Sequence, residues 1–304
     1  MYKSICLSLF LLISLLLSAQ KPDKAYSKEE KKAIRLERRD SLMMRLKEHI
    51  NDFGPDYNAD SVRRELESGP YFSLFKDNYF VGGIPLGQKI KASTSNVKFQ
   101  LSISHRLTKS VLPFDTYLFL QYSQKTIWNV FEESLPMRDM NFNPGIGIGR
   151  LIIHKNRYIG KTILMLEHES NGKDSLYSRS WNKISLGINL MLNRNFDTQL
   201  KLWIPIIDSD NNRDILNYNG IGHIGLNYYN NNRRFHAGLL ATWRTESFGF
   251  NTQWELSFKL NKKENQYLFI QYYNGYGENL LDYNQHKSII RMGLVIKPRD
   301  FTIY

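Results

Sequence analysis

The sequence predicts an all-β protein that crosses a membrane as a closed barrel of antiparallel strands. From about residue 70 onward, apolar and polar residues alternate with the period of two that marks a strand with two different faces. Aromatic residues are abundant, with 18 Tyr, 17 Phe and 5 Trp. After residue 19 there is no uninterrupted apolar run long enough for a membrane-spanning helix. Membrane barrels combine these features because their strands turn apolar side chains to lipid and polar ones to the lumen.

The N-terminal residues predict export. Lys3 precedes an apolar run over residues 7–17, and a cleavage site with small residues follows at Ala19. The run is shorter than the roughly 20 residues that an anchoring helix needs. We therefore expect a signal peptide over residues 1–19. The single cysteine, Cys6, lies within it, so we expect no disulfide and no cysteine chemistry in the exported chain.

Residues 21–50 are dense in Lys, Arg and Glu and predict a solvated helix ahead of the barrel. Ser27 and Glu30 have the spacing of a capping box at a helix start. Nothing in this stretch indicates a partner. The sequence thus divides into the signal peptide, a charged and partly helical periplasmic segment over residues 20–69, and a barrel domain over residues 70–304.

Four stretches within the barrel domain show the alternation most clearly, residues 98–107, 117–124, 253–260 and 290–296. The 235 residues of this domain, at about 20 per strand and connection, predict about a dozen strands. A water-soluble sandwich can show the same alternation. The charges on the polar face, the strand lengths and the terminal aromatic Tyr304, a common last residue of outer-membrane barrels, favour the membrane barrel.

The formal net charge of +12 admits nucleic acid as a counter-charge. An exported chain seldom meets nucleic acid, whereas anionic lipid headgroups surround a membrane protein. We therefore expect membrane lipid, and no nucleic acid, as the partner.

The stretch HESNGKDSLYSRSWN, residues 168–182, carries the strongest chemical signal in the chain. Alternate residues of a strand share a face, so His168 and Ser170 project from the same side. A serine nucleophile, a histidine base and a group that orients the base form the acyl-transfer triad. Asn182 supplies an amide for that third role, and it avoids placing a charge beside hydrocarbon.

The apolar neighbours predict which way these residues face. Leu164 and Leu166 share the face of His168 and Ser170. In the next strand Asn182 shares its face with the apolar residues Ile184, Leu186, Ile188 and Leu190. A hairpin centred near Ser175 would set His168 opposite Asn182 and Ser170 opposite Ser180, with Cβ atoms about 4.5–5.5 Å apart. The triad would therefore lie on the outside of the barrel, near the membrane rim, where the surrounding lipid is the substrate.

This stretch resembles the active-site segment of outer membrane phospholipase A, a bacterial family of calcium-dependent hydrolases built on a transmembrane β-barrel. The matching residues are His168, Ser170, Asn171, Gly172, Ser178, Arg179, Ser180, Trp181 and Asn182. Further similar segments are Lys98-Phe99-Gln100-Leu101-Ser102, Tyr122-Ser123-Gln124-Lys125 with Trp128, residues 134–141, Gly275-Tyr276-Gly277-Glu278 and Leu281-Asp282-Tyr283-Asn284. The resemblance covers most of residues 70–298. It implies twelve strands, an outer-membrane location and hydrolysis of acyl esters in phospholipids and lysophospholipids.

The resemblance also implies a calcium cofactor. Gly172, just past the nucleophile, can bring its N–H close to the oxyanion without side-chain obstruction, and the resemblance implies that it shares this role with a calcium-bound water. Carried over by position, the ligands are the Ser178 hydroxyl, the Lys173 carbonyl and the Ser134 carbonyl from a neighbouring subunit. Asp210 would serve a secondary calcium site.

Gln124 is a polar side chain on a lipid-facing row, which is costly unless it is paired. It could lie in water near the rim. The resemblance implies instead that the amide forms a hydrogen bond across a homodimer interface, and that dimerisation completes an acyl-chain groove and the calcium site.

The chain departs from the family at a few positions, among them Lys173 for the usual arginine, Ser175 where an acidic ligand can stand, Met137 for the usual phenylalanine and Glu169 for the common glutamine. A carbonyl ligand tolerates the change at Lys173, and Glu169 faces the lumen by parity. Two other interpretations remain, a non-catalytic outer-membrane barrel that is a porin or structural protein, and a soluble secreted esterase.

Overall fold

The protein is described by a computed structural model, which covers residues 29–30, 33–41, 44, 57–110, 112–206, 210–246, 249–261 and 264–298. The chain divides into two compact units, Met1–Asp52 and Phe53–Tyr304. The described residues of the first unit are helical, as the charged segment predicts. The expected signal peptide, Ser27 of the expected capping box and Tyr304 lie outside the described residues. No helix among those residues is long and apolar enough to cross a membrane.

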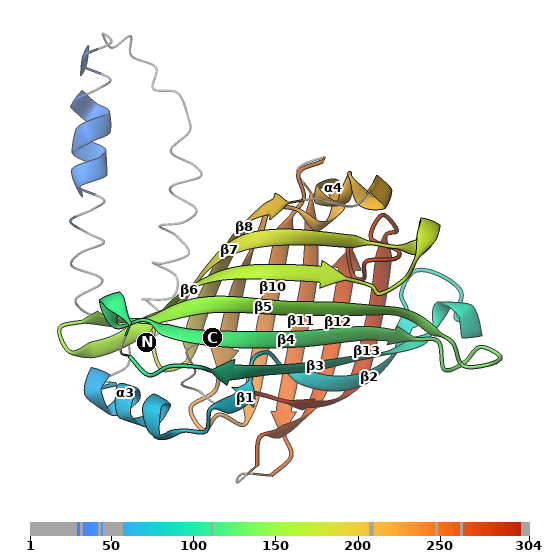
Figure 1. Cartoon of the computed structure of the whole chain (residues 1–304), viewed down its shortest axis with the longest axis horizontal. Coiled ribbons are helices and arrows are strands. Elements are labelled where there is room, and N and C mark those ends of the chain that lie inside the picture. Colours follow the sequence, from blue (N-terminus) through green and yellow to red (C-terminus); the bar gives the residue numbers. More distant parts are fainter. Residues whose placement is uncertain are drawn as a thin grey trace. The chain divides into compact units, whose positions relative to one another are not determined.

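Twelve antiparallel strands close into a barrel, as predicted (Figure 1). Each strand pairs with its neighbours along the chain, and β13 pairs with β2 to complete the circle. The strands are β2 (Asn78–Pro85), β3 (Asn96–Arg106), β4 (Tyr117–Trp128), β5 (Met137–His154), β6 (Arg157–Ser170), β7 (Ser180–Met191), β8 (Phe196–Ile206), β9 (Gly222–Tyr229), β10 (Phe235–Trp243), β11 (Phe250–Lys259), β12 (Gln266–Gly275) and β13 (Lys287–Ile296).

The two faces of the sheet are inverted relative to a water-soluble protein. Apolar side chains such as Leu101, Leu164 and Leu294 are exposed on the outside, whereas the charged side chains of Lys98 and Arg291 are buried in the lumen. This division is the one that lipid outside and a packed polar interior require. It explains why the period-two stretches of the sequence fall on β3, β4, β11 and β13.

Two strand segments together occupy the place of the first barrel strand. The short β1 (Phe72–Leu74) pairs with one half of β3, and β2 pairs with the other half. Side chains complete the ladder at the break, since Asn78 Oδ1 accepts from Ser102 N at 2.7 Å and Gln100 Nε2 donates to Asp77 O at 2.7 Å. The break therefore leaves the wall of the barrel continuous.

A helix, α3 (Ala59–Ser68), packs at the barrel end where β3 finishes (Figure 1). Asn58 caps its N-terminus by accepting from Ser61 N at 3.1 Å. Its buried face packs against strand residues in a cluster made of Val62, Leu66, Tyr117, Phe119, Leu151, Tyr158 and Met165. Arg106, the last residue of β3, donates to the carbonyls of Leu66, Glu67 and Gly69 and so satisfies the free C-terminal end of the helix.

Candidate active site

The hairpin of β6 and β7 has the predicted register. His168 pairs with Asn182 and Ser170 pairs with Ser180. Nδ1 of His168 lies 2.8 Å from Oδ1 of Asn182. An amide oxygen can only accept, so this hydrogen bond places the imidazole proton on Nδ1 and leaves Nε2 free to take another. Asn182 thus orients the ring and selects the tautomer that a general base needs.

Both strands present this pair on the outer face of the barrel. Exposed and buried residues alternate along them, with Leu164, Leu166, Ile184 and Leu186 exposed and Met165, Glu167, Trp181 and Ser185 buried. His168, Ser170 and Asn182 have the parity of the exposed set, as the sequence predicts. The side chains of Ser170, His168 and Asn182 therefore face the lipid and not the lumen.

The inner face of the same hairpin is anchored by ion pairs. Glu167 pairs with Lys201 at 2.5 Å, and Glu169 pairs with Lys183 at 3.0 Å. Trp181 Nε1 also donates to Glu169 at 3.1 Å. The lumen orientation predicted for Glu169 is thus confirmed. Because Glu167 is buried, loss of its cation would leave an uncompensated charge in the lumen, so these contacts hold the strand that carries His168 and Ser170 from its inner face.

The loop between β6 and β7 folds around the amide of Asn171, which is buried. Its Nδ2 donates to Tyr177 O at 2.9 Å, and its Oδ1 accepts from Arg179 N at 2.9 Å and from Lys173 N at 3.4 Å. The sequence identifies Asn171 only as part of a motif. No sequence pattern predicts the hydrogen bonds that Asn171 forms, because an asparagine in a polar loop looks like an ordinary turn residue.

Gly172 occupies a backbone conformation that favours glycine, with φ of 62°. A Cβ atom at this position would lie 2.9 Å from Cε2 of Phe142. Phe142 in turn pairs with Ser170 across β5 and β6. The aromatic ring therefore lies over the glycine, and only a residue without a side chain fits beside the nucleophile candidate.

The expected calcium ligands lie in two loops. Ser178 follows the 3-10 turn η3 (Ser175–Tyr177) and shares the β6–β7 loop with the exposed Lys173. Ser134 is exposed in the loop between β4 and β5. Among the described residues, no group of three or more His, Cys, Asp and Glu could hold a metal. The expected donors are hydroxyl and carbonyl oxygens, which fit the preference of calcium for hard ligands.

Asp210 is exposed and forms an ion pair with Arg213, whose Nε lies 3.0 Å from Oδ1. Its neighbour Asn211 donates to Ser175 O at 2.8 Å. The loop that carries Asp210 is thus held against the β6–β7 loop, although the Asp210 carboxylate itself contacts Arg213.

The same β8–β9 loop supplies a support that the sequence did not reveal. Asn212 is fully buried, donates through Nδ2 to Ser180 O at 3.0 Å and accepts from Ser180 N at 3.2 Å. Ser180 is the residue opposite Ser170. Behind it, Trp181 packs with Ile215, which begins the short helix α4 (Ile215–Asn219), and with Leu280 and Tyr283.

Gln124 lies on the outer face of β4, in the row that continues through Phe142 to Ser170. Its amide has partners within the chain, because Tyr122 Oη donates to Oε1 at 3.1 Å and Nε2 donates to Thr126 Oγ1 at 3.4 Å. These short-range contacts hold the amide on the barrel exterior at the level of the candidate site.

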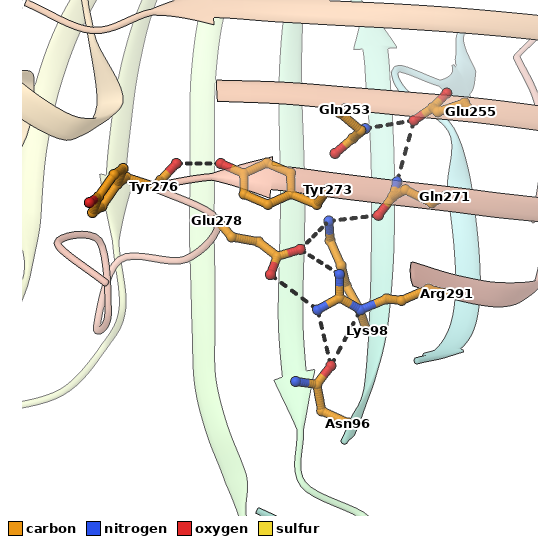
Figure 2. Close-up of polar contacts among 9 residues, drawn as sticks. All are labelled: Asn96, Lys98, Gln253, Glu255, Gln271, Tyr273, Tyr276, Glu278 and Arg291. Atoms are coloured by element: carbon orange, nitrogen blue, oxygen red, sulfur yellow. Dashed lines mark hydrogen bonds and ion pairs between the residues drawn. The ribbon is translucent and has the colours of Figure 1, made fainter. Parts of the chain in front are cut away.

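Charged side chains form ion pairs inside the lumen, as Figure 2 shows. Glu278, from the loop between β12 and β13, contacts Lys98 Nζ at 3.2 Å and Arg291 Nη1 at 2.6 Å. Gln271 accepts from Lys98 at 2.9 Å and donates to Glu255 at 3.3 Å. Side chains from β3, β11, β12 and β13 thus fill this part of the lumen with paired charges.

Comparison with known proteins points to one family. The Phospholipase A1 family matches residues 85–296. The chain is 31% identical over 211 residues to Phospholipase A1 of Escherichia coli (strain K12), which covers 67% of this chain and 71% of that protein. It is 28% identical over 212 residues to Phospholipase A1 of Proteus vulgaris, with the same coverage of 67% and 71%.

Two solved structures share the fold. The outer membrane phospholipase dimer of Salmonella typhi with bound calcium has a TM-score of 0.66 at 25% identity, and the match covers 74% of this chain and 91% of that one. Outer membrane phospholipase A of Escherichia coli has a TM-score of 0.68 at 23% identity, with 78% and 97% covered.

Proposed function

The chain belongs to the phospholipase A1 family, and we propose that it cleaves the acyl esters of membrane phospholipids and lysophospholipids with Ser170, His168 and Asn182. It is an outer-membrane β-barrel phospholipase. The observation that carries the assignment of the triad is the 2.8 Å contact between His168 Nδ1 and Asn182 Oδ1 on a lipid-facing hairpin. A serine of the same face lies two residues from the histidine.

In the reaction, Ser170 Oγ attacks the ester carbonyl carbon while Nε2 of His168 takes the hydroxyl proton. The tetrahedral intermediate then breaks its bond to the glycerol oxygen, and His168 returns the proton to that leaving oxygen. A water molecule, deprotonated by His168, attacks the acyl-serine and releases the fatty acid. Asn182 keeps the ring oriented through both half-reactions and adds no charge beside the lipid.

The developing oxyanion is stabilised by the backbone N–H of Gly172. Calcium would supply further positive charge to stabilise the oxyanion. We assign its ligands to the Ser178 hydroxyl, the Lys173 carbonyl and the carbonyl of Ser134 of the partner subunit. Asp210 is assigned to a secondary calcium site, where an ion would compete with Arg213 for the carboxylate.

Replacing Ser178 with alanine should raise the calcium concentration for half-maximal hydrolysis about tenfold or more, because one oxygen ligand is lost. Fatty-acid release from mixed micelles is measured during a calcium titration after removal of the bound metal by a chelator. Tyr177→Phe, a change in the same exposed turn, is the matched control and should titrate like the wild type. Full activity of the wild type in excess chelator would argue against calcium dependence.

We assign the active form to a homodimer in which Gln124 forms a hydrogen bond across the interface. Gln124→Ala should weaken dimerisation by about 1 kcal/mol, roughly fivefold in Kd. Sedimentation equilibrium in detergent with calcium measures this change. Gln253→Ala, which removes an amide bonded to Glu255 inside the lumen, should leave the dimer unchanged. An unaltered Kd for the Gln124 variant would remove this contact from the interface.

The alternatives are less well supported. A porin needs an aqueous path, whereas charged side chains pair with one another inside the lumen here, with Glu278 between Lys98 and Arg291. A soluble esterase would not present a barrel wall of exposed leucine and isoleucine.

A further inference from the structure

Strand β5 offers no backbone donor opposite His168. Phe142 pairs with Ser170 and Gly145 pairs with Glu167, so the register brings Pro144 opposite His168. Proline has no N–H and is normally excluded from strands that are paired on both sides. β5 is such a strand, since it pairs with β4 and β6.

The carbonyl of His168 points toward this gap. A Cβ atom at Gly147 would lie 3.0 Å from Leu164 O, and one at Gly145 would lie 3.1 Å from Leu166 O. These carbonyls of β6 therefore lie against β5. Because alternate residues of a strand turn their N–H and C=O groups to the same side, the carbonyl of His168 faces β5 as well. In a regular ladder it would accept from the residue that is here Pro144.

The side chain of Asn143 supplies the missing donor. Its Nδ2 donates to His168 O at 2.9 Å, and the residue is buried in the lumen. An unsatisfied buried carbonyl costs free energy, so this bond stabilises the strand at the base itself. Asn143 contacts the backbone of His168, not the imidazole, which faces the opposite side of the sheet.

Asn143 is itself held by a row of lumen side chains. Its Oδ1 accepts from Gln121 Nε2 at 3.4 Å, and Gln121 Oε1 accepts from Ser123 Oγ at 3.3 Å. Ser123 Oγ lies 2.6 Å from Ser102 Oγ. We call this row, Ser102–Ser123–Gln121–Asn143, the lumen relay. All four residues are buried and come from β3, β4 and β5.

A glycine makes room for the relay. A Cβ atom at Gly145 would lie 2.8 Å from Gln121 Nε2, so a larger residue there would push the amide away from Asn143. The absence of a side chain at Gly145 therefore leaves room for the Gln121 amide, which holds Asn143 in place.

We propose that Asn143 is a positioning residue of the hydrolase, which replaces the backbone donor lost at Pro144 and so sets the place of His168. The lumen relay fixes the amide of Asn143 from β3 and β4. The proposal rests on the assignment of His168 as the general base. In this proposal, side chains in the lumen determine the position of the base, whereas the substrate binds on the opposite face of the sheet.

A double-mutant cycle tests the proposal. Asn143→Leu removes the donor at similar size and should lower kcat about tenfold, because a small displacement of the base is costly, while KM stays within about twofold. Pro144→Ala restores a backbone N–H and should leave kcat near the wild-type value. The double variant should recover most of the lost rate, since the restored N–H can bond to His168 O.

Two further readouts separate positioning from general weakening of the fold. In Asn143→Leu, but not in the double variant, the pH–rate profile should differ from that of the wild type, because the base is displaced. In the Asn143→Leu variant, Ser170 should also react more slowly with a sulfonyl fluoride than it does in the wild type. Gln253→Leu, which also replaces a lumen amide by leucine but lies on β11, should alter neither. Should Asn143→Leu fail to fold, Gln121→Met breaks the lumen relay one step away and should lower kcat about threefold, whereas Gln253→Leu should leave kcat unchanged.

Wild-type kcat in the folded Asn143→Leu variant, or a double variant as slow as the single one, would overturn the proposal. Ser170→Ala, assayed in parallel, keeps the two hypotheses apart. If it is inactive while Asn143→Leu is unaffected, only the positioning role fails. If it is active, the proposed triad fails first.

Discussion

Replacing Ser170 with alanine should abolish phospholipid hydrolysis, with a loss in kcat of at least about 10³-fold. Without Oγ there is no nucleophile for the acyl-enzyme step, and His168 and Asn182 have nothing to activate. The side chain lies on the outer face at the end of β6, so its removal should leave the barrel intact. Fatty-acid release from mixed micelles at saturating calcium measures the rate. A difference in gel migration between unheated and heated samples reports whether the barrel is folded.

The hairpin provides a matched control for this variant. Ser180 lies directly opposite Ser170 on the same face. Asn212 forms hydrogen bonds with the backbone N–H and the backbone carbonyl of Ser180. Ser180→Ala should therefore retain activity within a few-fold of the wild type. A Ser170→Ala enzyme that works within tenfold of the wild type would show that the nucleophile lies elsewhere.

Replacing Glu278 with alanine should have the largest effect on stability. Lys98 and Arg291 are almost fully buried, and both depend on this carboxylate for charge compensation. Removing one partner of a buried ion pair costs roughly 3–5 kcal/mol, because the remaining charges are left unpaired. Unfolding in urea with the protein in detergent micelles, followed by tryptophan fluorescence, measures the free energy of unfolding.

Glu246→Ala is the control for this measurement, since Glu246 is exposed in the loop between β10 and β11. Its free energy of unfolding should change by less than about 0.5 kcal/mol. A loss below 1 kcal/mol in Glu278→Ala would mean that water, not the carboxylate, compensates the two cations.

The sequence predicts the barrel well because lipid makes the pattern strong. Each outward position of a strand needs an apolar residue, so the alternation identifies both the strand and its lipid face. The same parity predicts the register of His168 with Asn182 over a short hairpin. By contrast, Lys98 and Glu278 meet from positions 180 residues apart. No local pattern indicates that contact, since it depends on closure of the whole barrel.

The supports of the candidate site were missed for a common reason. Asn143, Asn171 and Asn212 all bind backbone atoms of other residues through their amides. In the sequence none of these asparagines has a local pattern that distinguishes it from a residue that only favours a turn. The helix α3 was similarly hidden, because only Ala59, Val62 and Leu66 form its buried face within a charged segment.

The docking of α3 carries a consequence for how the protein assembles. Its binding surface is composed of Arg106, Tyr117, Leu151 and Tyr158, which belong to β3, β4, β5 and β6. No single hairpin presents this surface, so it exists only once four strands stand side by side. The helix precedes all of them in the chain, yet it can reach its final place only after they have formed. We therefore expect the first described helix of this unit to be among the last elements to reach its place during folding.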